Sequence, residues 1–226
     1  MTIQIRGVYP LIRLTTALAL MTLGCSAMWA GAIVLEPIAN EFNTGRGNSS
    51  LIYGTFMIGF ALGGVFMGRL ADRMGIMIPA LIGSLALPAG FYLAAHASSI
   101  LEISLAFSLL CGFLGSSFSM APLIADISHW FSRRRGLAVG IAFSGSYVAG
   151  AIWPTILQRM FDAQGWRESF IDLALITLIF MALLSLILYP KPTANKHLPN
   201  AGSANSNLTK SSISAGTLQG LICLAG

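Results

Sequence analysis

Six long stretches of the chain contain no charged side chain and no histidine, and this pattern constrains the fold more than any other feature. A helix needs about 20 apolar residues to cross the hydrocarbon core of a bilayer. One ionised side chain at its centre costs roughly 2.5–3.5 kcal/mol on insertion scales. We therefore predict an all-α polytopic membrane protein, with a bundle of six transmembrane helices within residues 1–190. The predicted spans cover about residues 14–35, 51–68, 76–95, 103–125, 136–158 and 173–190.

The rest of the chain divides into two short regions. Residues 191–212 are rich in Pro, Asn, Ser, Thr and Lys, which is typical of a polar linker. Residues 213–226 are apolar again, but this stretch is too short to cross a bilayer. We interpret it as the start of a truncated seventh helix, so we expect the chain to be an incomplete transmembrane protein.

The basic residues are distributed unequally between the predicted loops. If the amino terminus is cytoplasmic, only Arg46, Arg159 and Arg167 lie outside. The positive-inside rule therefore predicts a cytoplasmic amino terminus and contact with lipid headgroups. Nucleic-acid binding is excluded, because it requires a basic face on a soluble module. The inner side then holds Arg6, Arg13, Arg69, Arg73, Arg133, Arg134, Arg135, Lys191, Lys196 and Lys210.

The turn between the second and third spans contains the most specific motif of the chain, Gly-Arg-Leu-Ala-Asp-Arg-Met-Gly over residues 68–75. One interpretation is a short basic turn in which Asp72 caps the third helix. The motif also resembles the signature loop of the major facilitator superfamily. That resemblance implies a cytoplasmic gate built from Gly68, Arg69, Asp72, Arg73 and Gly75. The sequence departs from the family pattern after Gly75, where Ile76 and Met77 replace two basic residues.

A second motif lies between the fourth and fifth spans. Residues 130–142 follow the pattern W-F-x-x-R-R-G-L-A-x-G-I-A. It resembles bacterial carriers near the monocarboxylate porter and oxalate/formate antiporter branches. This resemblance implies a protein of the bacterial inner (plasma) membrane. We expect Arg133, Arg134 and Arg135 to keep this loop inside and to join Asp126 and Asp72 in gate salt bridges. A third resemblance lies in the turn of residues 164–170.

Polar and aromatic residues inside the spans are candidates for a solute cavity. Carriers of this kind are paired repeats that rock around a site at the middle of the membrane. Interhelical hydrogen bonding is an alternative role for each of these residues. No carboxylate lies within the predicted spans. The candidates are Thr22, Ser26 and Trp29 on the first span, Ser116 and Met120 on the fourth, and Ser144 and Tyr147 on the fifth.

Together these features favour a transporter that moves a small solute by secondary active or facilitative alternating access. The resemblance implies an organic anion such as a monocarboxylate, possible coupling to an ion, and a missing carboxy-terminal half as partner. A self-contained six-span homodimeric carrier or channel is the alternative. We predict no enzyme activity, because residues 142–145 lack the leading glycine of a membrane serine protease. We also predict no cofactor and no metal, since Cys25, Cys111 and Cys223 lack ligand spacing.

Overall fold

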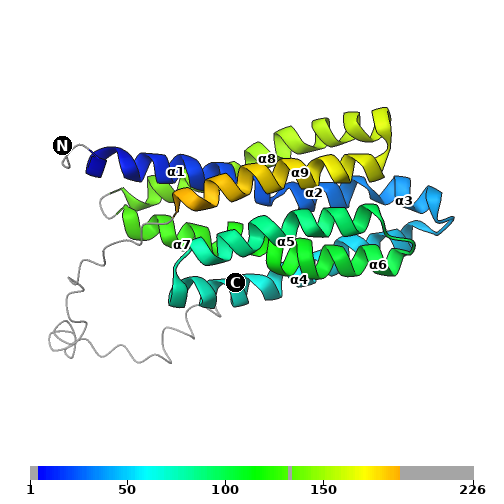
Figure 1. The fold of residues 1–226 in the computed structure, drawn as a ribbon, viewed down its shortest axis with the longest axis horizontal. Helices are drawn as coiled ribbons and strands as arrows, with labels where there is room; N and C mark the ends of the chain where they lie inside the picture. The colour runs from blue at the N-terminus through cyan, green and yellow to red at the C-terminus, as the bar shows by residue number, and fades with distance from the viewer. Residues whose placement is uncertain (1–4, 132–133, 189–226) are drawn as a thin grey trace, which may run out of the picture. The chain divides into compact units, whose positions relative to one another are not determined.

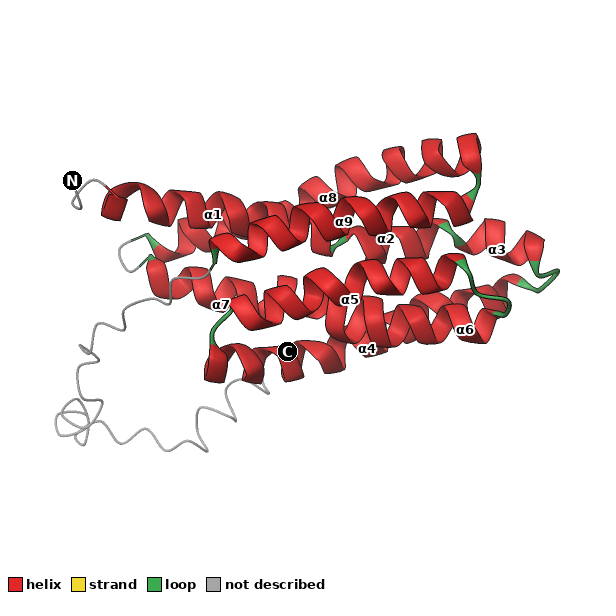
Figure 2. Cartoon of the chain, viewed as in Figure 1, coloured by secondary structure: helices red, strands yellow, loops and turns green. Residues whose placement is uncertain are grey.

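The computed structural model describes residues 5–131 and 134–188, and every regular element within them is a helix (Figure 2). Figure 1 labels the α-helices in chain order. The predicted linker and the predicted start of a seventh helix lie outside the described residues. The elements are α1 (Ile5–Gly24), α2 (Ser26–Ile33), α3 (Leu35–Glu41), α4 (Arg46–Met74), α5 (Met77–Ala95), α6 (Ile100–Leu105), η1 (Ala106–Ser116), η2 (Ser117–Ser119), α7 (Ala121–Trp130), α8 (Arg135–Gln164) and α9 (Trp166–Ile187).

Six helical segments are long and apolar enough to span a membrane, which confirms the predicted fold class. Several extend beyond the uncharged stretches of the sequence. The first begins before Arg13 and the fourth continues past Asp126, so both of these charged residues lie inside spanning helices. The spans are Pro10–Ile33, Ser49–Met74, Met77–Ala95, Ile100–Trp130, Arg135–Gln164 and Trp166–Ile187, here numbered span 1 to span 6.

Span 4 is a broken helix. It begins as α6, widens into the π-helix η1, tightens into the 3-10 turn η2 and is interrupted at Met120, whose φ and ψ are −98° and −97°. It then restarts as α7, with Pro122 in the first turn, where a missing N–H group costs nothing. Long π-helices are rare, and π-bulges occur frequently at functional sites. The break therefore marks span 4 as a region to search for a site.

Close helix packing surrounds this broken span. A Cβ at Gly59 or Gly63 of α4 would overlap the backbone of η1, so glycine at these positions lets the two helices approach each other. The ring of Phe107, near the start of η1, lies 6.1 Å from that of Phe91 and 5.7 Å from that of Phe170, between centroids. These aromatic contacts hold α5, η1 and α9 together.

The other helix pair that matters for the site is α1 with α8. A Cβ at Gly145 would lie 2.6 Å from the carbonyl oxygen of Leu18, so this glycine also allows a close approach. The Trp153 indole N–H donates a 2.7 Å hydrogen bond to the Thr22 carbonyl. In Figure 1, α1 and α7 and the carboxyl end of α9 reach the same end of the bundle, on the left.

Candidate functional site

A buried arginine cluster joins spans 1, 4 and 6 at this end. Nε and Nη2 of Arg13 donate 2.8 Å hydrogen bonds to the two carboxylate oxygens of Asp126, a bidentate ion pair. Nη1 of Arg13 donates to the Leu188 carbonyl at 3.2 Å, just beyond the last turn of α9. The guanidinium carbon lies 4.8 Å from the ring centroid of Trp130. We call this set of four residues the Arg13 clamp.

In the Arg13 clamp, Asp126 has a different partner from those that the sequence predicts. The sequence pattern placed this carboxylate in a loop and paired it with Arg133, Arg134 and Arg135. It lies instead in α7, and both of its oxygens accept hydrogen bonds from Arg13. Arg135 donates to the Ser128 hydroxyl at 3.1 Å, while Arg134 is exposed and Arg133 lies outside the described residues. The sequence prediction failed because the helix does not end before Asp126. Since α7 continues to Trp130, Asp126 lies on a buried face of this helix, where it meets Arg13 of span 1.

The signature motif of residues 68–75 is mostly helix rather than loop. Gly68, Arg69, Asp72 and Arg73 lie in the last turns of α4, and Gly75 ends the helix with a φ of 86°. The predicted helix cap at Asp72 is therefore wrong, because Asp72 lies within α4. The N-cap residue of α5 is Ile76, and no side chain donates or accepts a capping hydrogen bond there. Arg69 donates to the Val65 carbonyl of its own helix, at 3.4 Å.

A second arginine cluster lies at the opposite end and joins α3, the end of span 3 and span 6. Nη2 of Arg167 lies 2.7 Å from a carboxylate oxygen of Glu41, while the Trp166 indole N–H donates to the other oxygen at 2.7 Å. Nη1 of Arg167 donates to the carbonyls of Ala95 and Ala97, at 2.6 and 3.0 Å. Its guanidinium carbon lies 4.4 Å from the ring centroid of Trp166. We call these residues the Arg167 clamp.

The electrostatics of the Arg167 clamp favour an ionised Glu41. Burial raises the pKa of this carboxyl group, but the hydrogen bonds from Arg167 and Trp166 and the positive charge of Arg167 outweigh that effect. The net result is a pKa below the ordinary value for glutamate. The two side chains of the ion pair nevertheless remain partly exposed, at 35% for Arg167 and 42% for Glu41.

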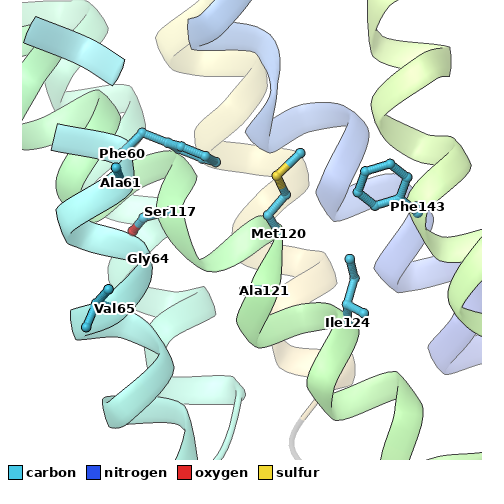
Figure 3. Close-up of a pocket in the computed structure, with 9 residues that line it drawn as sticks. All are labelled: Phe60, Ala61, Gly64, Val65, Ser117, Met120, Ala121, Ile124 and Phe143. Carbon is cyan, nitrogen blue, oxygen red and sulfur yellow. The ribbon is translucent and has the colours of Figure 1, made fainter. Parts of the chain in front are cut away.

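A cavity of about 590 Å³ lies beside the break in span 4, between α4, α7 and α8 (Figure 3). In this view Met120 lies between Phe60 of α4 and Phe143 of α8. The lining is almost entirely apolar, and it includes no charged side chain. The residues that line it are Phe60, Ala61, Gly64 and Val65 from α4, Ser117 from η2, Met120, Ala121 and Ile124 at and after the break, and Phe143 from α8.

Of the predicted cavity residues, only Met120 lines this cavity. Thr22 joins two helices instead, because its hydroxyl lies 3.0 Å from the Gly145 carbonyl of α8 and 2.9 Å from the Leu18 carbonyl of α1. The Ser144 hydroxyl donates to the Ile141 carbonyl of its own helix at 2.7 Å. Tyr147, one turn further along α8, is 73% exposed, and its ring centroid lies 5.9 Å from that of the cavity residue Phe143.

The remaining three predicted residues, Ser26, Trp29 and Ser116, carry buried polar atoms. Within the described residues, Oγ of Ser26, Nε1 of Trp29 and Oγ of Ser116 make no hydrogen bond. Buried polar groups are nearly always paired in folded proteins. These three groups, on α2 and η1, therefore lack a partner that an ordered buried water could supply.

Comparison with known proteins decides the family. The family model described as "Major Facilitator Superfamily" matches residues 16–225, which is most of the chain. The chain belongs to the major facilitator superfamily. The structure agrees with this assignment, because the described part of the chain contains six spanning helices and no strand.

Individual members of the superfamily are similar to this chain over part of their length. Human monocarboxylate transporter 11 is 34% identical over 149 residues, which is 64% of this chain and 31% of that protein. Mouse monocarboxylate transporter 2 is 28% identical over 192 residues, 84% of this chain and 40% of that protein. A riboflavin transporter of Trypanosoma cruzi is 35% identical over 108 residues, 47% of this chain and 23% of that protein. The chain thus spans well under half the length of these relatives.

The sequence interpretation missed several residues that the structure brings together in this superfamily member. Arg13 was counted only as a basic residue of the inner side. A stronger signal was its position directly before an uncharged stretch, where an arginine inside a helix requires a buried partner. Glu41 carried no recognisable pattern, and Phe60 and Phe143 resembled ordinary core residues. Their roles follow from contacts between residues far apart in the sequence.

Proposed function

We propose that this chain is part of a carrier that moves a small organic anion, such as a monocarboxylate, across a membrane by alternating access. The family assignment and the two monocarboxylate transporter relatives support this proposal. Superfamily carriers consist of repeats that rock around a site near the membrane midplane. The broken span 4 and its cavity supply one wall of such a site in this chain.

The observation that carries the proposal is that the cavity is open on one side. Ala61, Val65 and Ala121 line it and are nevertheless exposed, and a Cβ added at Gly64 would meet nothing within 4 Å. A second six-helix half would close this open side. We therefore propose that the partner of residues 1–188 is the carboxy-terminal half of the same carrier.

We propose that the residues around the end of α4 form the gate on the cytoplasmic side. Asp72 lies in the last turn of α4, where a negative charge is unfavourable against the helix dipole, and it is exposed. A cationic or helix N-terminal partner in the second half would compensate for this cost. The gate set is Gly68, Arg69, Asp72, Arg73 and Gly75, with Arg133, Arg134 and Arg135 as further candidates.

In Figure 1 the carboxyl end of α4 lies at the same end of the bundle as α7, which the Arg13 clamp ties to α1. We propose that the Arg13 end faces the cytoplasm, in agreement with the excess of basic residues there, and that the carrier resides in a plasma membrane. The relatives reported above come from eukaryotes, so an origin in a bacterial inner membrane stays a prediction.

The test is uptake into proteoliposomes. The polypeptide made from the intact gene is purified and reconstituted, and uptake of radiolabelled pyruvate is compared with that of a neutral sugar and of an organic cation, with and without proton and sodium gradients. We expect saturable pyruvate uptake, and we expect residues 1–226 alone to insert without transport. Saturable uptake by residues 1–226 as a dimer would favour the homodimeric alternative, and uptake of the cation alone would overturn the anion assignment.

A further inference from the structure

The cavity beside the break in span 4 has an apolar lining that suits the apolar part of a solute. It presents rings of Phe60 and Phe143, the thioether of Met120 and aliphatic surface, without any charged group. Its one hydroxyl belongs to Ser117 and donates to the Phe113 carbonyl at 2.5 Å. A carboxylate placed inside would therefore be buried without a partner, which is strongly unfavourable.

The size and shape of the cavity also fit a compact apolar group. Its volume of about 590 Å³ lies within the range of roughly 300–1,000 Å³ that is usual for small-molecule sites. Figure 3 shows the two phenylalanines on opposite sides of Met120. Aromatic side chains favour offset or edge contacts with another ring, and a methionine thioether adapts to a planar group. Small residues at Ala61, Gly64 and Ala121 leave room for an occupant.

We propose that this cavity binds the ring-sized apolar group of the transported anion, while its carboxylate stays outside the cavity toward the second half. This inference rests on the proposed function and extends the expected solutes from pyruvate to organic anions that carry an aromatic or branched hydrocarbon group. The polar atoms of the solute then face groups of the proposed second half.

The experiment compares two solutes in the reconstituted carrier made from the intact gene: pyruvate, and phenylpyruvate, which adds an aromatic ring to the same carboxylate. The test variant is Gly64→Leu, which fills the cavity, and the matched control is Gly54→Leu. Both glycines lie in α4, and a Cβ at either position would meet nothing within 4 Å, but only Gly64 lines the cavity. Ala121→Leu is the second test variant.

We expect Gly64→Leu and Ala121→Leu to raise the KM for phenylpyruvate by about tenfold relative to the KM for pyruvate. Gly54→Leu should leave that ratio within about twofold. Equal losses for both solutes in the test variants would overturn the proposal, and would indicate that a lipid chain or a side chain of the second half occupies the cavity. A wild-type carrier that transports pyruvate but not phenylpyruvate would also overturn it. Uptake of neither anion would contradict the proposed function itself.

Discussion

The two ends of the bundle are held by the same chemical groups in different surroundings. Each clamp consists of an arginine, a carboxylate, a tryptophan ring against the guanidinium and at least one backbone carbonyl. The Arg13 clamp ties span 1 to spans 4 and 6. The Arg167 clamp ties span 6 to α3 and to the end of span 3. The Arg13 ion pair is buried, however, whereas the Arg167 pair is more than one third exposed.

This difference teaches that burial, rather than the list of contacts, sets what each clamp contributes. A buried ion pair is costly to break, because the remaining charge has no access to water. An exposed pair is screened and adds about 0–1 kcal/mol. We therefore expect the Arg13 clamp to be essential for the stability of the half, and the Arg167 clamp to adjust it. For the same reason, we expect the helices at the Arg167 end to separate more easily than those at the Arg13 end.

The largest expected effect is that of Arg13→Met. The change leaves Asp126 buried without a partner, so we expect the free energy of unfolding to fall by about 3–5 kcal/mol. Denaturant unfolding in detergent micelles, followed by tryptophan fluorescence, measures it. The control is the double variant Arg13→Met/Asp126→Leu, which removes both charges and should recover most of the loss. If Arg13→Met unfolds like the wild type, the Arg13 pair is no more important than a surface pair.

A smaller effect is expected when each arginine is replaced by lysine. Lysine keeps the charge but cannot make the bidentate contact with a carboxylate. At Arg13 the change also deprives the buried Leu188 carbonyl of its donor, so we expect a loss of about 1–3 kcal/mol. The matched variant Arg167→Lys should lose less, because water reaches that site. The same unfolding assay measures both variants. Equal losses in the free energy of unfolding would contradict the expectation that the buried clamp contributes more than the exposed one.

The smallest effect is the pH dependence of the Arg167 clamp. The pKa of Glu41 is lowered in the folded protein, so its contribution is fully present above the ordinary glutamate pKa of about 4.3. It is lost as the pH falls through the lower, folded-state pKa. At pH 7 we expect Glu41→Gln to reduce stability by about 0.2–1 kcal/mol. Melting curves of wild type and variant from pH 7 to pH 3 should converge at the acid end, and a gap that widens there would contradict the pKa direction.

Parts of the site could be predicted from residue type, and parts could not. Met120 was chosen because it lies among the serines of span 4, and it does line the cavity. Thr22 belonged to the same kind of polar stripe, yet it bonds a carbonyl of α8. A polar residue on a membrane helix can serve a ligand or a neighbouring helix, and only the helix packing distinguishes the two. Tyr147 does not line the cavity in this half, although its ring contacts that of the lining residue Phe143.

The sequence by itself determined the number of spans, the all-helical fold and the family, because the cost of charge in a bilayer is local and can be read along one segment at a time. Only the tertiary structure decided that Asp126 pairs with Arg13, that Glu41 pairs with Arg167 and that span 4 breaks at Met120. Arg13 and Asp126 are 113 positions apart in the chain. A local pattern carries no information about such a distance, and the partner is set by how α1, α7 and α9 pack.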